Sequence, residues 1–451
     1  MEFFRHSDSI RIAFVCDFFY PRLGGVEMHL YSLAQHLIRL QHKVVIITHA
    51  YGKRKGVRYL PGPLKVYYCP FMPMIDQDTI PTFSSSLPLM RHILIRERIQ
   101  IVHAHQATST MANESLVYAA ALGLASVYTD HSLFGFDDVA SVILNRVLQA
   151  TLSTVDAAIA VSHVCQHNLI LRAKIQSDRI HVIPNAIDPT KFIPDPSRRS
   201  SDRIKVVVIS RLVYRKGVDL LVGVIPIICQ QVPEVDFIIG GDGNRLLALQ
   251  ETVEQNQLQD RVCFLGAVPH NQVRDILCQG HIFLNCSLTE SFCIALLEAA
   301  CCGLLVVSTC VGGVPEVLPE DMIILSDPTI YALVLHLKLA VRRQQASADA
   351  ENVFQFHNRV KEMYSWERVA EETIKIYRKV MGEKRKNLWE RLHHYASLGL
   401  ISGFLVCLLI LTLELWLVVI EWWQPYDSID QVPDLPSLKA KKDDIAVRNC
   451  T

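Results

Sequence analysis

Two carboxylates within residues 281–318 have the spacing and surroundings of a ligand site. Glu290 and Glu298 are eight positions apart, about two helical turns, and we expect Glu290 at the mouth of a helix and Glu298 inside it. The apolar segments HIFLN and LLVVST on either side are typical of buried strands. Three amides at the predicted helix N-terminus are free to hold a phosphate, those of Phe292, Cys293 and Ile294. A sugar diphosphate fits this set, because its phosphates bind the amides and its hydroxyls donate to the carboxylates.

A second interpretation is that both glutamates lie on the solvated face of an amphipathic helix. The residues around Glu298 are Phe, Cys, Ile, Ala and Leu, which is an unusual setting for a surface carboxylate. The pattern therefore favours the ligand site and leaves the surface helix as the alternative.

Three other groups follow predicted strands, where α/β proteins place their ligands. Arg211 and Lys216 could neutralise a diphosphate, although an exposed basic loop is the alternative. Gly24 and Gly25 would let a ligand approach the backbone at a helix start, and a plain turn explains the pair equally well. His131 follows the strand SVYT at a catalytic position, although a lone histidine is more often structural.

Two further motifs carry less information. Asp76-Gln77-Asp78 resembles the DxD metal site of other sugar transferases, but it lies in a proline-rich loop and not at the end of a buried strand. We therefore expect no metal there. The basic segment YGKRKGVR, residues 51–58, is compatible with anionic lipid headgroups and equally with a solvated turn.

Two runs of alternating strands and helices must position these residues. Expected strands of the first run are 11–16, 43–49, 101–105, 126–129 and 157–161, with helices at 26–39, 87–98 and 139–152. Residues 184–203 hold four prolines and are typical of an interdomain linker. Expected strands of the second run are 204–210, 236–240, 261–266, 281–285 and 304–309. This alternation predicts an α/β fold with two parallel, doubly wound sheets and a ligand between them.

One segment, residues 398–420, is long and apolar enough to span a bilayer, with Glu414 as its single charge. Basic residues crowd its upstream flank, and the downstream flank has no Lys or Arg until Lys439. The positive-inside rule therefore predicts cytosolic domains before the span and a luminal tail, 421–451, after it. The N-terminus lacks a signal-peptide pattern, so we expect this helix to target and anchor the chain. Asn449 is a glycosylation sequon in the tail.

The composition excludes several classes of protein. The 45 basic and 45 acidic residues balance, and no basic run interleaves with aromatics, so nucleic acid is not an expected partner. The 13 cysteines form no CxxC pair, which argues against zinc and redox sites and for reduced structural thiols.

These residues resemble those of retaining, metal-independent glycosyltransferases with two facing Rossmann-like domains, the GT-B type. A closer resemblance, over about residues 10–425, is to the catalytic subunits of phosphatidylinositol N-acetylglucosaminyltransferases. It rests on HAYGKRKGVRYL, TDHSLFGF, IPNAIDPTKF, SRLVYRKGVDLL, HIFLNCSLTESFC and VGGVPEVLPE. It implies an acceptor-side domain at 1–189, a nucleotide-sugar domain with returning helices at 190–385, and membership of a multi-subunit complex in the endoplasmic reticulum membrane.

The resemblance also implies a role for each site residue. Arg211 and Lys216 hold the diphosphate of UDP-N-acetylglucosamine, and the amides of 292–294 add to that grip. Glu298 accepts from the ribose and Glu290 from the sugar, while His131 contacts the sugar and helps orient the reacting centre. Gly24 and Gly25 lie under the donor phosphates or the acceptor, which is phosphatidylinositol.

Two other functions remain open from the residues. The first is a membrane-anchored retaining transferase for another hexose or another lipid acceptor, since Glu290 and Glu298 look identical in both. The second is a membrane-tethered interaction protein without chemistry. The joint presence of Arg211, Lys216, Glu290 and Glu298 argues against an inactive site. No cofactor beyond the donor substrate is expected.

Overall fold

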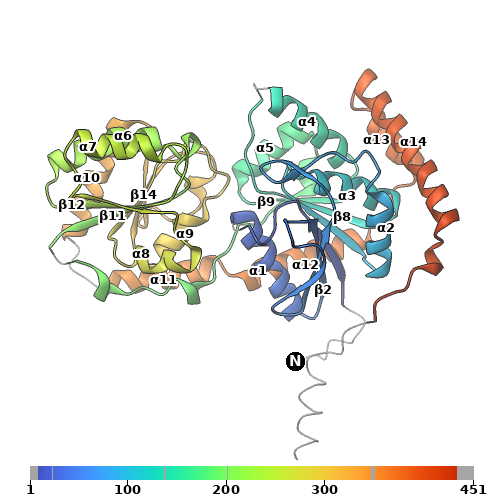
Figure 1. The fold of residues 1–451 in the computed structure, drawn as a ribbon, viewed down its shortest axis with the longest axis horizontal. Coiled ribbons are helices and arrows are strands. Elements are labelled where there is room, and N and C mark those ends of the chain that lie inside the picture. The colour runs from blue at the N-terminus through green and yellow to red at the C-terminus, as the bar shows by residue number, and fades with distance from the viewer. Residues whose placement is uncertain (1–8, 23, 137–138, 201, 347–350, 434–451) are drawn as a thin grey trace, which may run out of the picture.

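The computed structural model describes residues 9–22, 24–136, 139–200, 202–346 and 351–433. It has two α/β domains side by side, each built on a largely parallel sheet with helices on both faces (Figure 1). The predicted fold class is confirmed. Asn449 and most of the predicted tail lie outside the described residues.

The N-terminal sheet has eight strands in the order β10-β9-β8-β7-β1-β2-β4-β3, and β3 alone runs antiparallel to its neighbour. Its strands are β1 (Arg11–Val15), β2 (Lys43–His49), β3 (Gly56–Leu60), β4 (Leu64–Cys69), β7 (Ile101–His105), β8 (Ala125–Asp130), β9 (Ala157–Ala160) and β10 (Ile180–Val182). A small hairpin, β5 (Pro73–Ile75) with β6 (Asp78–Thr79), follows β4. The parallel strands end at one edge, where the ligand is expected.

Helices cover both faces of this sheet because successive strand residues point to opposite sides. In β1, Ile12 and Phe14 pack in one core and Ala13 and Val15 in another. The first core includes α1 (Gly25–Arg39), α4 (Val139–Leu152) and α5 (His163–Ala173). The second includes α2 (Leu87–Arg96) and α3 (Thr110–Ala121). The central strands of this domain therefore have a buried surface on each side.

The C-terminal sheet has six parallel strands in the order β13-β12-β11-β14-β15-β16. They are β11 (Ile204–Ile209), β12 (Val235–Gly240), β13 (Val262–Gly266), β14 (Ile282–Asn285), β15 (Leu305–Thr309) and β16 (Ile323–Ser326). Its helices are α6 (Val218–Gln231), α7 (Leu246–Gln255), α8 (His270–Leu277), α9 (Ile294–Cys301), α10 (Ile330–Ala346) and α11 (Glu351–Met363). The strand order places β11 and β14 side by side in the middle, which brings the loops after them together.

The chain crosses between the domains twice. In the described part of the predicted linker, the helical elements are short 3-10 turns at Pro189–Lys191 and Pro196–Arg198. Helix α12 (Trp366–Gly382) then returns to the N-terminal domain and packs against α1 and β8. Its Tyr377 hydroxyl lies 2.7 Å from Nδ1 of His103, and the Trp366 ring lies 5.3 Å from the ring of His29. Helix α12 therefore belongs to the N-terminal core, although it follows the second domain in the sequence.

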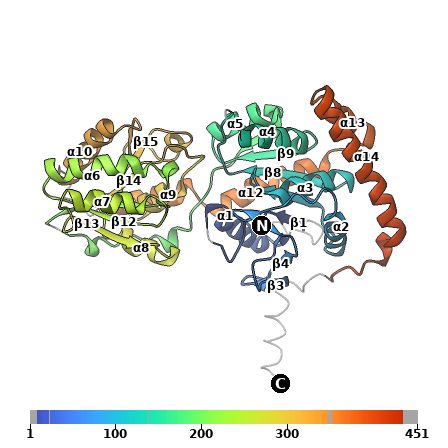
Figure 2. The same ribbon diagram turned by 45° about the horizontal axis from the view of Figure 1, so that its top comes forward.

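Helices α13 (Leu388–Ala396) and α14 (Leu400–Trp423) form a pair on the outer side of the N-terminal domain (Figures 1 and 2). Among the described residues, α14 is the one helix long and apolar enough to cross a membrane, and it begins and ends two to three residues later than predicted. Leu413 and Ile420 pack in the core beneath α2, and Arg391 bonds Glu414 at 2.6 Å. The opposite side of α14 exposes apolar side chains from Leu400 to Trp423.

Candidate active site

Lys216 and Glu290 form an ion pair where β11 and β14 end, with Nζ 2.5 Å from Oε1. Lys216 closes a 3-10 turn after β11, and Gly217 follows with φ of +69°. A Cβ on Gly217 would lie 1.7 Å from the main-chain oxygen of Cys286, so only glycine lets this turn press against the end of β14. The close approach brings the basic turn to the acidic loop, as the sequence predicts.

Charged groups of the predicted site lie near the start of α9. Helix α9 begins at Ile294, so Glu290 lies in the loop before it and Glu298 within it. The N-cap, Cys293, has φ of +69°, and Phe292 is buried beneath. Burial raises the pKa of the Cys293 thiol, nearby Glu290 raises it further and Lys216 lowers it. The charges of Glu290 and Lys216 therefore both act at the N-terminus of α9, which is predicted to hold a phosphate.

Glu298 is a buried carboxyl group rather than a surface one. Its side chain is 15% exposed, and its nearest basic partner, Nδ1 of His270, is 4.0 Å away. Burial raises the pKa of Glu298 to about 8. The alternative of a solvated helix face is therefore wrong for Glu298.

His131 lies in a cluster of imidazoles at the carboxyl end of the N-terminal sheet. Its Nε2 is 3.2 Å from Nδ1 of His105, and the ring of His29 lies 4.7 Å away, edge to face. Burial, followed by the neighbouring His29 and His103, lowers the pKa of His131 well below its usual value. His131 is therefore a neutral hydrogen-bonding group at neutral pH.

Three of these rings, those of His29, His105 and His131, offer nitrogen atoms within 4.8 Å of one another, as a metal site would need. Two hydrogen bonds already occupy nitrogen atoms of these three rings. His105 bonds His131, and Nδ1 of His29 lies 2.9 Å from Oδ1 of Asn185. Nε2 of His105 is buried without a partner among the described residues.

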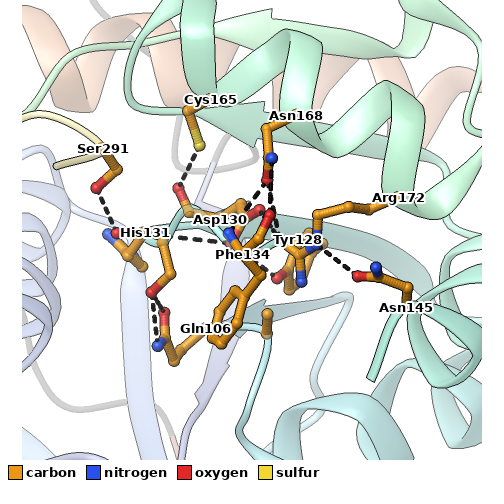
Figure 3. A network of polar contacts seen from close by, with 12 residues as sticks. Gln106, Tyr128, Asp130, His131, Phe134, Asn145, Cys165, Asn168, Arg172 and Ser291 are labelled. Atoms are coloured by element: carbon orange, nitrogen blue, oxygen red, sulfur yellow. Dashed lines mark hydrogen bonds and ion pairs between the residues drawn. The ribbon is translucent and has the colours of Figure 1, made fainter. Parts of the chain in front are cut away.

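A buried polar network lies next to His131 (Figure 3). Asp130 and Arg172 are both fully buried and form an ion pair at 3.2 Å. The Arg172 guanidinium also donates to Asn145 at 2.8 Å and stacks over the Phe134 ring. Burial raises the pKa of Asp130 to about 6, while Arg172 opposes that rise. This network holds in place the main chain at Asp130, the residue directly before His131.

Gly24 and Gly25 begin α1 and face the second domain. A Cβ on Gly24 would lie 2.5 Å from Oε2 of Glu27, and one on Gly25 would lie 3.8 Å from Cδ1 of Ile294. Arg211 is exposed after β11, and its charge acts on Glu27 of the N-terminal domain. Burial, the dominant effect, raises the pKa of Glu27, and Arg211 lowers it. Gly25 therefore lies opposite the start of α9.

Direct hydrogen bonds join the two domains at this site. Ser291 Oγ donates to the main-chain oxygen of His131 at 2.6 Å, and Ser162 Oγ donates to that of Ser291 at 2.7 Å. The Glu316 carboxylate accepts from the amides of His163 and Val164 at 2.7 and 2.9 Å. These bonds place the loop that carries Glu290 beside His131 and the start of α5.

Sequence reasoning missed several members of this region: Glu27, His29, His105, Asp130, Arg172 and Ser291. The alternation in IVHAH, with His103 and His105 at a strand end, was the available signal for the imidazole cluster. The predicted DxD loop forms the β5–β6 hairpin, where Asp76 bonds Arg22 at 3.0 Å. It lies apart from the Lys216–Glu290 pair, in the other domain.

Comparison with protein families gives two matches on this chain. The model described as PIGA (GPI anchor biosynthesis) matches residues 49–138, and that described as Glycosyl transferases group 1 matches residues 190–353. Relatives named as a subunit of phosphatidylinositol N-acetylglucosaminyltransferase occur in Arabidopsis thaliana and Homo sapiens. Each is 49% identical, covering 94% of this chain and 94% and 87% of the respective relative. The gpi3 subunit of Schizosaccharomyces pombe is 46% identical over 93% of this chain and 92% of its own length.

Solved structures confirm the fold. Sucrose-phosphate synthase from Thermosynechococcus elongatus superposes with a TM-score of 0.67 at 18% identity, covering 82% of this chain and 99% of that one. HepE from Anabaena, solved with UDP, gives 0.65 at 19% identity, covering 82% of this chain and all of that one.

Proposed function

The chain belongs to the PIGA family of phosphatidylinositol N-acetylglucosaminyltransferases, and from this premise we propose how its residues divide the reaction. It is a GT-B glycosyltransferase that transfers N-acetylglucosamine to phosphatidylinositol, the first step of GPI anchor synthesis. We propose UDP-N-acetylglucosamine as the donor. The Lys216–Glu290 pair opposite His131 is the observation that carries the assignment of the site.

The donor diphosphate binds at the start of α9. Its phosphates accept from the amides of residues 292–294, and Arg211 and Lys216 supply positive charge. Lys216 already contacts Glu290, so it reaches the phosphate from a fixed position, while the second oxygen of Glu290 accepts from a sugar hydroxyl. Glu298 accepts from the ribose, and Gly24 and Gly25 leave room under the phosphates.

Transfer proceeds with retention by attack on the face that the phosphate leaves. The acceptor oxygen bonds the anomeric carbon as the bond from that carbon to the phosphate oxygen breaks, and the acceptor proton passes to the departing phosphate. The protein supplies position and charge stabilisation, with Arg211 and Lys216 in place of a metal ion. Neutral His131 bonds the sugar and helps orient the reacting centre. This assignment leaves Glu290 a binding residue rather than a nucleophile.

We also propose a single-pass anchor in the endoplasmic reticulum membrane, with both α/β domains cytosolic and the tail luminal. Helix α14 has the length and apolar surface for this role. The relatives are named as subunits, which supports assembly with other proteins.

Transfer from labelled UDP-N-acetylglucosamine to phosphatidylinositol, measured in membranes, tests the site. Lys216→Ala and Glu290→Ala should each abolish most activity, while Arg342→Ala, on the exposed side of α10, should retain it. Equal activity in all variants contradicts the assignment. Full activity in excess EDTA supports the metal-independent scheme, whereas loss of activity that magnesium or zinc restores contradicts it. UDP-glucose and other lipid acceptors, tested in parallel, address the alternative substrates.

A further inference from the structure

A basic edge, formed by Lys53 and Lys55, lies in the turn that leads into β3. The turn before β3 is closed by reciprocal main-chain bonds between Tyr51 and Arg54, at 3.1 and 2.9 Å. Both lysines of the basic edge are exposed, and neither forms an ion pair within the described part of the chain. This edge is therefore open to an anionic partner.

Large apolar side chains are exposed beside the basic edge. Tyr59 of β3 is 63% exposed, and Met72, shortly after β4, is 71% exposed. Exposed apolar groups interleaved with cations are typical of surfaces that rest at a lipid–water interface.

The register of β3 shows which way this surface faces. β3 is the edge strand of its sheet (Figure 2), and Val57 pairs with Tyr67 of β4. Paired residues in neighbouring strands point to the same face, and Tyr67 packs in the core that includes α2 and Leu413 of α14. Val57 and Tyr59 therefore point to the side of the sheet that carries the membrane helix.

The hairpin is also bonded to the loop that borders the active site. The Tyr51 hydroxyl donates to the main-chain oxygen of Asp17 at 2.6 Å and accepts from the amide of Phe19 at 3.1 Å. The Arg54 guanidinium lies 4.5 Å from the centre of the Tyr20 ring. The turn before β3 is therefore bonded to residues 17–20, which precede Gly24 and Gly25 in the sequence.

We propose that the basic edge, with Val57, Tyr59 and Met72, rests on the anionic phospholipid surface of the membrane. Charge complementarity argues for lipid as the occupant, because exposed lysines beside exposed apolar side chains fit the headgroups and acyl boundary of an anionic lipid surface. If the proposed function holds, the acceptor headgroup passes from this surface along residues 17–22 to the glycine pair. The surface contact itself does not depend on the transferase reaction.

Photo-crosslinking in nanodiscs tests the contact on the full chain. Benzoylphenylalanine replaces Tyr59 or, as a control, Tyr331 of α10, which is 82% exposed. The discs contain phosphatidylcholine alone or doped with phosphatidylserine or phosphatidylinositol. We expect lipid adducts at residue 59 several-fold above those at residue 331, and a rise with either anionic lipid. Equal adducts at both positions overturn the proposal, as does capture of another protein instead of lipid in native membranes.

Charge reversal tests the role of the basic edge. Lys53→Glu with Lys55→Glu changes the net charge as much as Arg342→Glu with Arg343→Glu on α10. The first pair should lower the lipid adducts and raise KM for phosphatidylinositol about tenfold, leaving KM for the donor unchanged; the second should change neither. Unchanged adducts in the first pair overturn the inference even if transfer is normal. A wild-type chain that forms adducts but transfers no sugar contradicts the proposed function alone.

Discussion

Ser291 Oγ lies 2.6 Å from the main-chain oxygen of His131, so one hydroxyl of the C-terminal domain holds the residue proposed to contact the sugar from the N-terminal domain. Ser291 directly follows Glu290, whose carboxylate contacts Lys216. The consecutive residues Glu290 and Ser291 therefore contact Lys216 in one domain and His131 in the other.

Removing this hydroxyl should reduce catalysis more than stability. One hydrogen bond of this type contributes about 1 kcal/mol, so Ser291→Ala should lower kcat/KM roughly five- to tenfold with little change in Tm. Ser153→Ala, which removes a local bond to Ala150 in α4, is the matched control and should leave kcat/KM unchanged. Unaltered kinetics in Ser291→Ala would show that the domains close without this bond.

The Lys216–Glu290 pair is suited to a double-mutant cycle. Both side chains are partly buried, at 21% and 12% exposure, so their interaction should be stronger than that of a surface pair. We expect Lys216→Met and Glu290→Gln to be coupled by about 1 kcal/mol in thermal unfolding without donor. The exposed Arg359–Asp321 pair should give a smaller coupling. A coupling of zero at the first pair would mean that Lys216 and Glu290 meet only when donor is bound.

The raised pKa of Glu298 makes donor binding depend on pH. Burial moves this pKa from 4.5 to about 8, so the carboxyl group is protonated in the free enzyme at neutral pH. In its proposed role Glu298 accepts from two ribose hydroxyls, which requires the ionised form. Donor affinity should therefore rise about tenfold per pH unit up to pH 8 and then level off. In Glu298→Gln the donor affinity should be weaker and independent of pH over this range.

The same carboxyl group affects stability with a defined sign. Its folded-state pKa lies above the unfolded value, so unfolding releases a proton between pH 4.5 and 8, and stability falls across that window. Glu298→Gln should unfold at a higher temperature than wild type at pH 8 and at nearly the same temperature at pH 4.5. A difference of the same size at both pH values would contradict a buried, protonated Glu298.

Much of this site could be predicted from sequence because its residues follow strands. Arg211, His131 and the acidic loop stand at the ends of apolar runs, and parallel sheets bring such ends together. The contribution of Asp130 and Arg172 could not be predicted, since they are 42 positions apart and meet only through the packing of α5 on β8. Nor could Ser291 be assigned, because its partner is a main-chain atom of the other domain.

Arg172 should be important for folding because it is the charged partner of a buried acid. Arg172→Met leaves Asp130 without its cation, a loss of about 3–5 kcal/mol where Asp130 is ionised. The pKa of Asp130 is about 6, raised from 3.8, so the loss should be large at pH 7 and smaller at pH 4, where the carboxyl group is protonated. Asp130→Asn in the Arg172→Met background should recover part of the stability at pH 7. Equal losses at both pH values would mean that Arg172 acts through packing alone.

The position of α14 gives the last prediction. In the structure Arg91 of α2 bonds Glu421 and donates to the main-chain oxygen of Gln424 at 3.0 Å, so the end of α14 lies against the N-terminal domain. A helix of 24 residues is about 36 Å long, and one that crosses a bilayer has its ends on opposite sides. The proposed luminal tail therefore requires these contacts to separate in a membrane.

Spin labels at positions 92 and 424, with exposed Cys263 and Cys310 replaced by serine, measure this separation. His92 and Gln424 are in hydrogen-bond contact at 3.3 Å in the structure, so the labels should be close in detergent. In nanodiscs we expect a distance on the order of the bilayer thickness, about 30 Å or more. A short distance in both media would contradict the single-pass topology, because it would keep residue 424 on the cytosolic side and leave the exposed face of α14 to hold the membrane.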